Sequence, residues 1–99
     1  MIHTKISKTI EVYTPHNFED VYALTHSMYN LTSKNIIIDC QNVRVLPSHF
    51  ISLAISKNDF IVLINVSHTA MNIFKTIGVI DEIHVFKTLE EAITYINTK

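Results

Sequence analysis

The sequence contains very little glycine, cysteine and clustered basic charge, and each shortage argues against a class of function. One glycine among 99 residues cannot form the glycine-rich turn that lets backbone amides approach nucleotide phosphates. The single cysteine, Cys40, cannot form an internal disulfide, so we expect a reducing compartment and a cytoplasmic location. The eight Lys and Arg residues are spread along a chain of net charge −1. They form no basic cluster of the kind that tracks phosphates, so we expect no nucleic-acid partner.

Long apolar runs and metal-ligand spacings are also missing. No run approaches the roughly 20 apolar residues that cross a bilayer, and the N-terminus lacks the apolar core of a signal peptide. We therefore expect no direct membrane insertion. The six histidines show none of the close spacings that zinc sites use, and the lone cysteine adds little. The sequence thus predicts no metal and no cofactor.

Apolar residues, by contrast, are plentiful. They make up 47% of the chain, with a mean hydropathy of +0.23, which is at the upper end for a soluble domain. A chain of 99 residues is expected to fold as one domain, residues 1–99, with a core of its own. We expect one apolar surface to remain for a protein partner or for a second copy of the chain in a homodimer.

The periodicity of the apolar residues predicts alternating strands and helices. Residues 4–14 alternate between apolar and polar side chains, which is typical of a strand at a sheet edge with one solvent-exposed face. Buried strands are expected near residues 36–39, 60–65 and 83–86. Helices between and after them are marked by the capping residues Asn17, Ser67, Thr88 and Gly78. The first helix carries an apolar stripe of Phe18, Val21, Leu24, Met28 and Leu31.

This order, β-α-β-α-β-α-β-α, predicts an α/β fold. The sheet is expected to be four-stranded and mostly parallel, with an antiparallel edge strand and about four helices. In such sheets, ligands and partners meet the carboxyl ends of the strands. The most informative segment lies there: residues 35–53, NIIIDCQNVRVLPSHFISL, in which a buried strand ends at Asp39 and a helix opens at Pro47 and Ser48.

Three segments resemble the STAS family, the domain of sulfate transporters and anti-sigma-factor antagonists. They are NIIIDCQNVRVLPS, FIVLINVSHTAMNIFKTIGVIDEIHVF and KTLEEAITYI, and together they cover about two-thirds of the chain. The resemblance implies a STAS-like fold and a non-catalytic protein-interaction module in bacterial signalling. Its partner would be an anti-sigma kinase-like protein, met through the loop and helix around residues 39–52.

The family's phosphoacceptor motif is altered in this chain. Pro47 takes the place of the family's Asp, and Ser48 matches its first hydroxyl residue. His49 stands where the phosphorylated Ser or Thr would be, and Phe50 replaces the Gly. The resemblance therefore implies a degenerate Ser/Thr switch, with Ser48 as the only phosphorylation candidate. We expect Phe50 to be the apolar anchor that contacts the partner.

Each of these residues also has a simpler interpretation. Ser48 could cap the helix, and His49 could be an exposed imidazole rather than a phosphoryl acceptor or a pH-dependent contact. We favour Asp39 as a residue that braces the loop over a receiver-like phosphoacceptor, and Cys40 as a packing residue over a nucleophile.

Two further functions stay open. The chain could be a STAS accessory subunit of a transport complex, with a transporter component as its partner. A receiver-like phosphotransfer protein is the least favoured, because the first strand has no acidic pair. We expect the chain not to be an enzyme.

Overall fold

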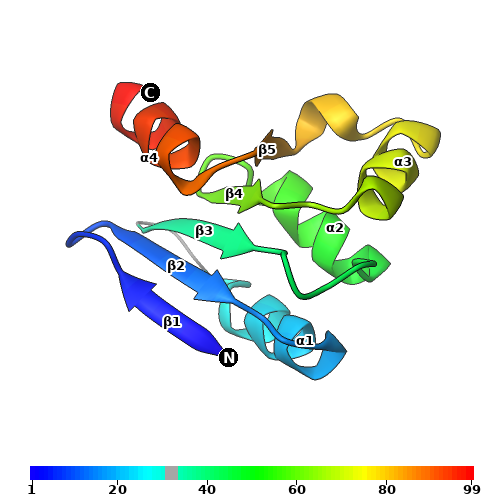
Figure 1. Ribbon diagram of the computed structural model, residues 1–99, viewed down its shortest axis with the longest axis horizontal. Helices are drawn as coiled ribbons and strands as arrows, with labels where there is room; N and C mark the ends of the chain where they lie inside the picture. Colours follow the sequence, from blue (N-terminus) through cyan, green and yellow to red (C-terminus); the bar gives the residue numbers. More distant parts are fainter. Residues whose placement is uncertain (31–33) are drawn as a thin grey trace.

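The computed structural model describes residues 1–30 and 34–99. Within these residues the chain forms a five-stranded sheet, four α-helices and one short 3-10 helix (Figure 1). The strands are β1 (Ile2–Lys5), β2 (Ile10–Thr14), β3 (Asn35–Asp39), β4 (Ile61–Ile64) and β5 (His84–Phe86). The α-helices are α1 (Phe18–Ser27), α2 (Ser48–Ser56), α3 (His68–Thr76) and α4 (Leu89–Thr98), and the 3-10 helix is η1 (Ile80–Glu82).

The strands lie in the order β1-β2-β3-β4-β5. β2 to β5 run parallel, and β1 pairs antiparallel with β2 at one edge. The α/β class, the mostly parallel sheet, the antiparallel edge strand and the four α-helices are therefore confirmed. The carboxyl ends of β2 to β5 meet at one end of the sheet, opposite the β1–β2 hairpin (Figure 1).

The predicted number of strands was one too low. Residues 4–14 form two strands, because the chain reverses between Lys5 and Ile10, where the amides of Ile6 and Ser7 both donate to the carbonyl of Ile10. This turn contains no glycine. The antiparallel edge strand is thus β1, whose residues are all exposed, while β2 lies inside the sheet.

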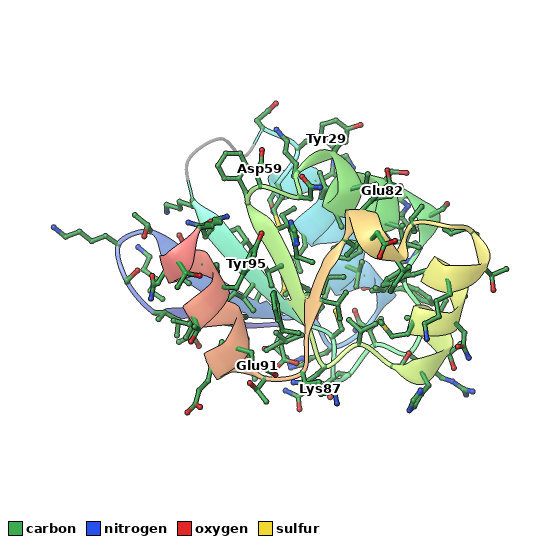
Figure 2. The ribbon with its side chains drawn as sticks, turned by 90° about the horizontal axis from the view of Figure 1, so that it is seen from above. Tyr29, Asp59, Glu82, Lys87, Glu91 and Tyr95 are labelled. Atoms are coloured by element: carbon green, nitrogen blue, oxygen red, sulfur yellow. The ribbon has the colours of Figure 1, made fainter. Side chains whose placement is uncertain are left out.

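The two faces of the sheet have separate cores. α1, α2 and α3 pack on one face against Ile36, Ile38, Ile61 and Leu63. On the other face, α4 packs through Ala92 and Ile96 against the alternate strand residues, Ile10, Val12, Ile37, Val62 and Ile64. Seen from above, α4 lies on one side of the sheet and α2 and α3 on the other (Figure 2). Double coverage explains why the central strands are almost uniformly apolar.

The caps predicted at Asn17, Ser67, Thr88 and Gly78 are confirmed. Asn17, Ser67 and Thr88 each accept a hydrogen bond from the amide three residues later. Gly78 follows α3 with φ +78°, a left-handed conformation that costs glycine nothing. In α1, Val21, Leu24 and the following Met28 are buried, but Phe18 is 49% exposed, so its place in the buried stripe was wrong. Leu31 lies outside the described residues. No helix among the described residues has the length and apolar character needed to cross a membrane.

Candidate partner-binding site

The loop of residues 40–47 connects β3 to α2 at the carboxyl end of the parallel strands (Figure 1). Three of its side chains, Cys40, Val43 and Leu46, are buried and fix the loop to the core. Gln41, Asn42, Arg44 and Val45 are exposed between them. The loop therefore exposes both polar and apolar side chains, while its buried side chains fix its backbone to the core.

Asp39 braces this loop from the end of β3. Its Oδ1 accepts hydrogen bonds from the Gln41 amide at 3.2 Å and from Asn65 Nδ2 at 3.0 Å, and its Oδ2 accepts from Gln41 Nε2 at 2.7 Å. Both carboxylate oxygens are thus used to join the loop to the end of β4. This geometry favours the loop-bracing interpretation of Asp39, because an acyl-phosphate acceptor needs a free carboxylate oxygen.

A second set of bonds ties the loop to α3. Ser67 Oγ donates to the Arg44 carbonyl at 2.5 Å and also accepts from the Ala70 amide at 3.1 Å. Arg44 Nε donates to Thr69 Oγ1 at 3.4 Å. Ser67, which caps α3, therefore also holds the loop at Arg44. Together with Asp39, which holds the loop at Gln41, it constrains the exposed segment 41–45 near both of its ends.

Ser48 is the first residue of α2, and it does not cap this helix. The capping position is occupied by Pro47, which is half-buried and offers no side-chain hydrogen bond. The amides of Phe50 and Ile51 bond the Pro47 carbonyl instead. The interpretation of Ser48 as a cap is therefore wrong. Its side chain is exposed, and its hydroxyl has no hydrogen-bond partner among the described residues.

His49 is half-buried between α1 and α2, and is not a freely exposed imidazole as one interpretation had it. Its ring stacks on Tyr22, with ring centroids 4.4 Å apart and planes inclined by 22°. The Nε2 atom is buried and has no hydrogen-bond partner among the described residues. The residue therefore contributes mainly packing between the two helices.

Phe50 is fully buried, with 0% of its surface exposed. Its expected role as an apolar anchor for a partner is therefore wrong. α2 turns Phe50, Ile51, Leu53 and Ala54 toward the sheet, and Phe50 packs in the core shared by α1, α2 and α3. The ring cannot reach another protein while this core is intact.

The exposed aromatic side chains of this region lie on and just after α1. Phe18 is 49% exposed, Tyr22 51% and Tyr29 68%. Phe18 lines a shallow hollow of about 410 Å³ together with the loop residues Arg44 and Val45. Sequence reasoning missed this surface, although Tyr22 and Tyr29 each follow a buried residue by one position and so fall beside the buried stripe.

Cys40 is buried beneath the loop, so its packing interpretation fits the geometry. Burial and the neighbouring Asp39 carboxylate raise the pKa of the Cys40 thiol to about 12. The thiol therefore stays protonated near neutral pH, whereas a nucleophilic cysteine acts as the thiolate. Among residues 1–30 and 34–99, no three His, Cys, Asp or Glu side chains are grouped so that they could hold a metal ion.

Comparisons with known proteins bear on the fold. Neither a family model nor a curated protein matches the sequence. Among solved structures, a candidate anti-sigma factor antagonist from Thermotoga maritima matches in its NMR structure with TM-score 0.70 and 15% identity, over 96% of this chain and 87% of that chain. Its crystal structure matches with TM-score 0.68 and 12% identity, over 94% and 92%.

A sulfate transporter family protein from Wolinella succinogenes matches with TM-score 0.68 and 18% identity, over 96% of this chain and 90% of that chain. At such identities the likeness concerns the fold. The resemblance found in the sequence is thereby confirmed at the level of structure: this chain has the STAS-like fold of an anti-sigma factor antagonist and of a sulfate transporter family protein.

Proposed function

We propose that residues 1–99 form a single cytoplasmic, non-catalytic interaction module that docks a regulatory protein in bacterial signalling, in the manner of an anti-sigma-factor antagonist. The observation that carries this proposal is the braced 40–47 loop beside exposed apolar side chains. Phe18, on α1, and Val45, in the loop, line one hollow at the carboxyl end of the sheet. The docking surface is defined here as Phe18, Tyr22, Arg44, Val45 and Ser48.

The geometry of this surface suits binding. Loops that are already held in one conformation lose little entropy when a partner binds, and the 40–47 loop is held by Asp39 from one side and by Ser67 from the other. Large aromatic side chains and arginine supply much of the energy in protein interfaces. Phe18 and Arg44 provide both kinds of side chain in one hollow, and the exposed Tyr22 lies one helical turn after Phe18 on α1.

Two other residues near the start of the loop argue for a docking function and against phosphotransfer catalysis. The two groups that a phosphotransfer mechanism would use are Asp39, whose oxygens are both hydrogen-bonded, and Cys40, whose thiol is buried and protonated. The partner we favour is an anti-sigma factor of the kinase type.

Replacing Phe18 with Asp should weaken partner binding by an order of magnitude or more, because it places a charge where an apolar side chain would be covered. The partner is first captured from the native host with the tagged wild-type chain, and its affinity for purified variants is then measured by calorimetry. Ile6→Asp is the matched control, since Ile6 is 40% exposed and lies in the hairpin at the opposite end of the sheet. Equal affinities of the two variants would refute the proposed surface.

Incubation with ATP and the cognate kinase should add little phosphate, and any phosphate should be on Ser48. Ser48 offers an exposed hydroxyl at the start of α2, where free amides and the helix dipole stabilise a phosphate. Mass spectrometry of Ser48→Ala should show no modified peptide, whereas Ser52→Ala, one turn later, should behave like the wild type. An acid-labile phosphate on His49 would contradict this assignment.

A second function is favoured by one observation, the shared fold with a sulfate transporter family protein. The chain would then be an accessory subunit that binds a transporter component through the same surface. The capture experiment separates the two functions by the protein that is retained: a kinase-type regulator supports the first, and a transporter subunit supports the second.

A further inference from the structure

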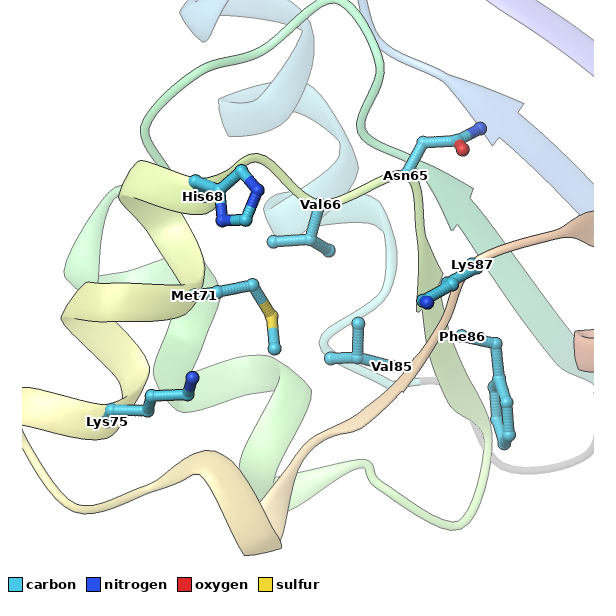
Figure 3. A pocket seen from close by; sticks show the side chains of 8 residues that line it. All are labelled: Asn65, Val66, His68, Met71, Lys75, Val85, Phe86 and Lys87. Atoms are coloured by element: carbon cyan, nitrogen blue, oxygen red, sulfur yellow. The ribbon is translucent and has the colours of Figure 1, made fainter.

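A cavity lies on the opposite side of β4 from the β3–α2 loop, between α3 and β5 (Figure 3). It has a volume of about 480 Å³, within the range of small-molecule sites. Asn65, directly after β4, and Lys87, directly after β5, both line it. The cavity therefore occupies the carboxyl ends of two parallel strands, where α/β sheets bind ligands.

The polar rim of this cavity is cationic. Lys75 on α3 and Lys87 after β5 point into the cavity from its two sides, and His68 lines it at the start of α3 (Figure 3). Among the described residues that line it, there is no Asp or Glu. Neither lysine lies within ion-pair distance of a carboxylate in the part of the chain that the structure describes. Two unpaired ammonium groups thus face one hollow.

The floor of the cavity is apolar. Val66, Met71 and Val85 line it, and all three are half-buried and packed against the core under α1, α2 and α3. Methionine adapts its shape readily to different apolar ligands. A ligand that fits would therefore place an apolar body on these side chains and an anionic head between the two lysines.

We propose that this cavity binds a small amphipathic carboxylate, that is, an organic acid with an apolar chain or ring. The carboxylate lies between Lys75 and Lys87, and the apolar part covers Met71 and Val85. A neutral ligand of the same length loses the contacts to both lysines, and acetate loses the apolar contacts. No residue of the 40–47 loop or of the docking surface lines the cavity, so the proposal does not rest on the docking function.

The test is a titration of the full chain with octanoate, 1-octanol and acetate, followed by NMR of the Met and Val methyl groups. Octanoate should shift the Met71 and Val85 methyl signals saturably, and 1-octanol and acetate should bind about tenfold more weakly or worse, since exposed charge pairs contribute several-fold each. The variant carrying both Lys75→Gln and Lys87→Gln should lose about tenfold in octanoate affinity. High salt should weaken octanoate binding to the wild type.

The control variant carries Lys5→Gln and Lys8→Gln, which remove two exposed lysines at the other end of the sheet and leave the cavity intact. It should bind octanoate like the wild type. Non-saturable shifts, shifts confined to methyl groups outside the cavity, or equal octanoate affinity in both double variants would each overturn the proposal. Circular dichroism confirms that the compared variants are folded.

Discussion

Replacing Phe50 with Ala should lower the free energy of unfolding by about 3–5 kcal/mol, the usual cost of removing a buried phenylalanine side chain. The ring is completely buried and belongs to the core that joins α1, α2 and α3 to the sheet. Domains of this kind are stable by only about 5–15 kcal/mol in total, so a large share of the stability is lost. Phe50→Asp should unfold the chain, because it also buries an unpaired charge. Urea unfolding followed by circular dichroism measures both variants.

Phe18→Ala is the matched control for the same residue type. Phe18 is 49% exposed, so its removal should cost less than about 1 kcal/mol. The two phenylalanines thus separate stability from binding: Phe50 should affect unfolding, and Phe18 should affect partner affinity. A Phe50→Ala variant that unfolds at the wild-type urea concentration but no longer binds the partner would restore Phe50 as an interface anchor.

The position of Phe50 could have been predicted from the helix period. Phe50, Leu53 and Ala54 are spaced three and four residues apart, which places them on one face of α2. The resemblance to the STAS family placed Phe50 in the partner-binding motif and so predicted an exposed Phe50 ring. The local pattern was the better guide, since an amphipathic helix over a sheet turns its apolar stripe inward.

Helix caps and buried strands were predictable because their causes are local. Ser67 and Thr88 cap helices with their own oxygens, and Gly78 takes a left-handed conformation. The four residues of β4 are all buried, and its apolar run indicated this directly. The alternation of strands and helices indicated the mostly parallel direction of the strands, and the resemblance to the STAS family implied the same fold.

Contacts between distant segments were not predictable from one sequence. The β1–β2 turn carries no Asn-Gly or similar dipeptide, the usual sign of a tight hairpin. The bonds from Asp39 to Asn65 and from Ser67 to Arg44 join residues more than 20 positions apart. The docking surface depends on these bonds and on the packing of α1 beside the loop, so only the structure brings its residues together.

The burial of the Glu11 carboxylate is the clearest consequence of such long-range contacts. The alternating pattern of residues 4–14 predicts that polar side chains such as Glu11 are exposed, but only 4% of the surface of Glu11 is exposed. Lys34 Nζ lies 2.6 Å from Oε2, and His3 Nε2 lies 2.6 Å from Oε1, to which Tyr13 also donates at 3.4 Å. β2 lies between β1 and β3, and these two neighbouring strands enclose the Glu11 carboxylate.

Glu11→Gln should reduce the free energy of unfolding by about 2 kcal/mol near neutral pH, the usual contribution of hydrogen bonds to a charged group. The hydrogen bond from Lys34 is the main cause that lowers the pKa of Glu11 below its ordinary value of 4.5, and His3 adds to it against the opposing effect of burial. A lowered pKa in the folded state stabilises the protein above 4.5, and this stabilisation is lost as the pH falls from 4.5 through the folded-state pKa. The difference in unfolding free energy between wild type and Glu11→Gln should therefore shrink as the pH falls below 4.5.

Removing the Lys34 ammonium group is a second test of the contribution of the Glu11 carboxylate. Lys34→Met should raise the pKa of Glu11 toward or above its ordinary value, because burial then acts with less compensation. The acid unfolding midpoint of Lys34→Met should move to higher pH, and Glu82→Gln, which changes an exposed carboxylate, should leave it unchanged. Unfolding in urea at a series of pH values measures these effects. If Glu11→Gln and Glu82→Gln gave the same pH profile, the buried Glu11 carboxylate would not be the group that links stability to acid.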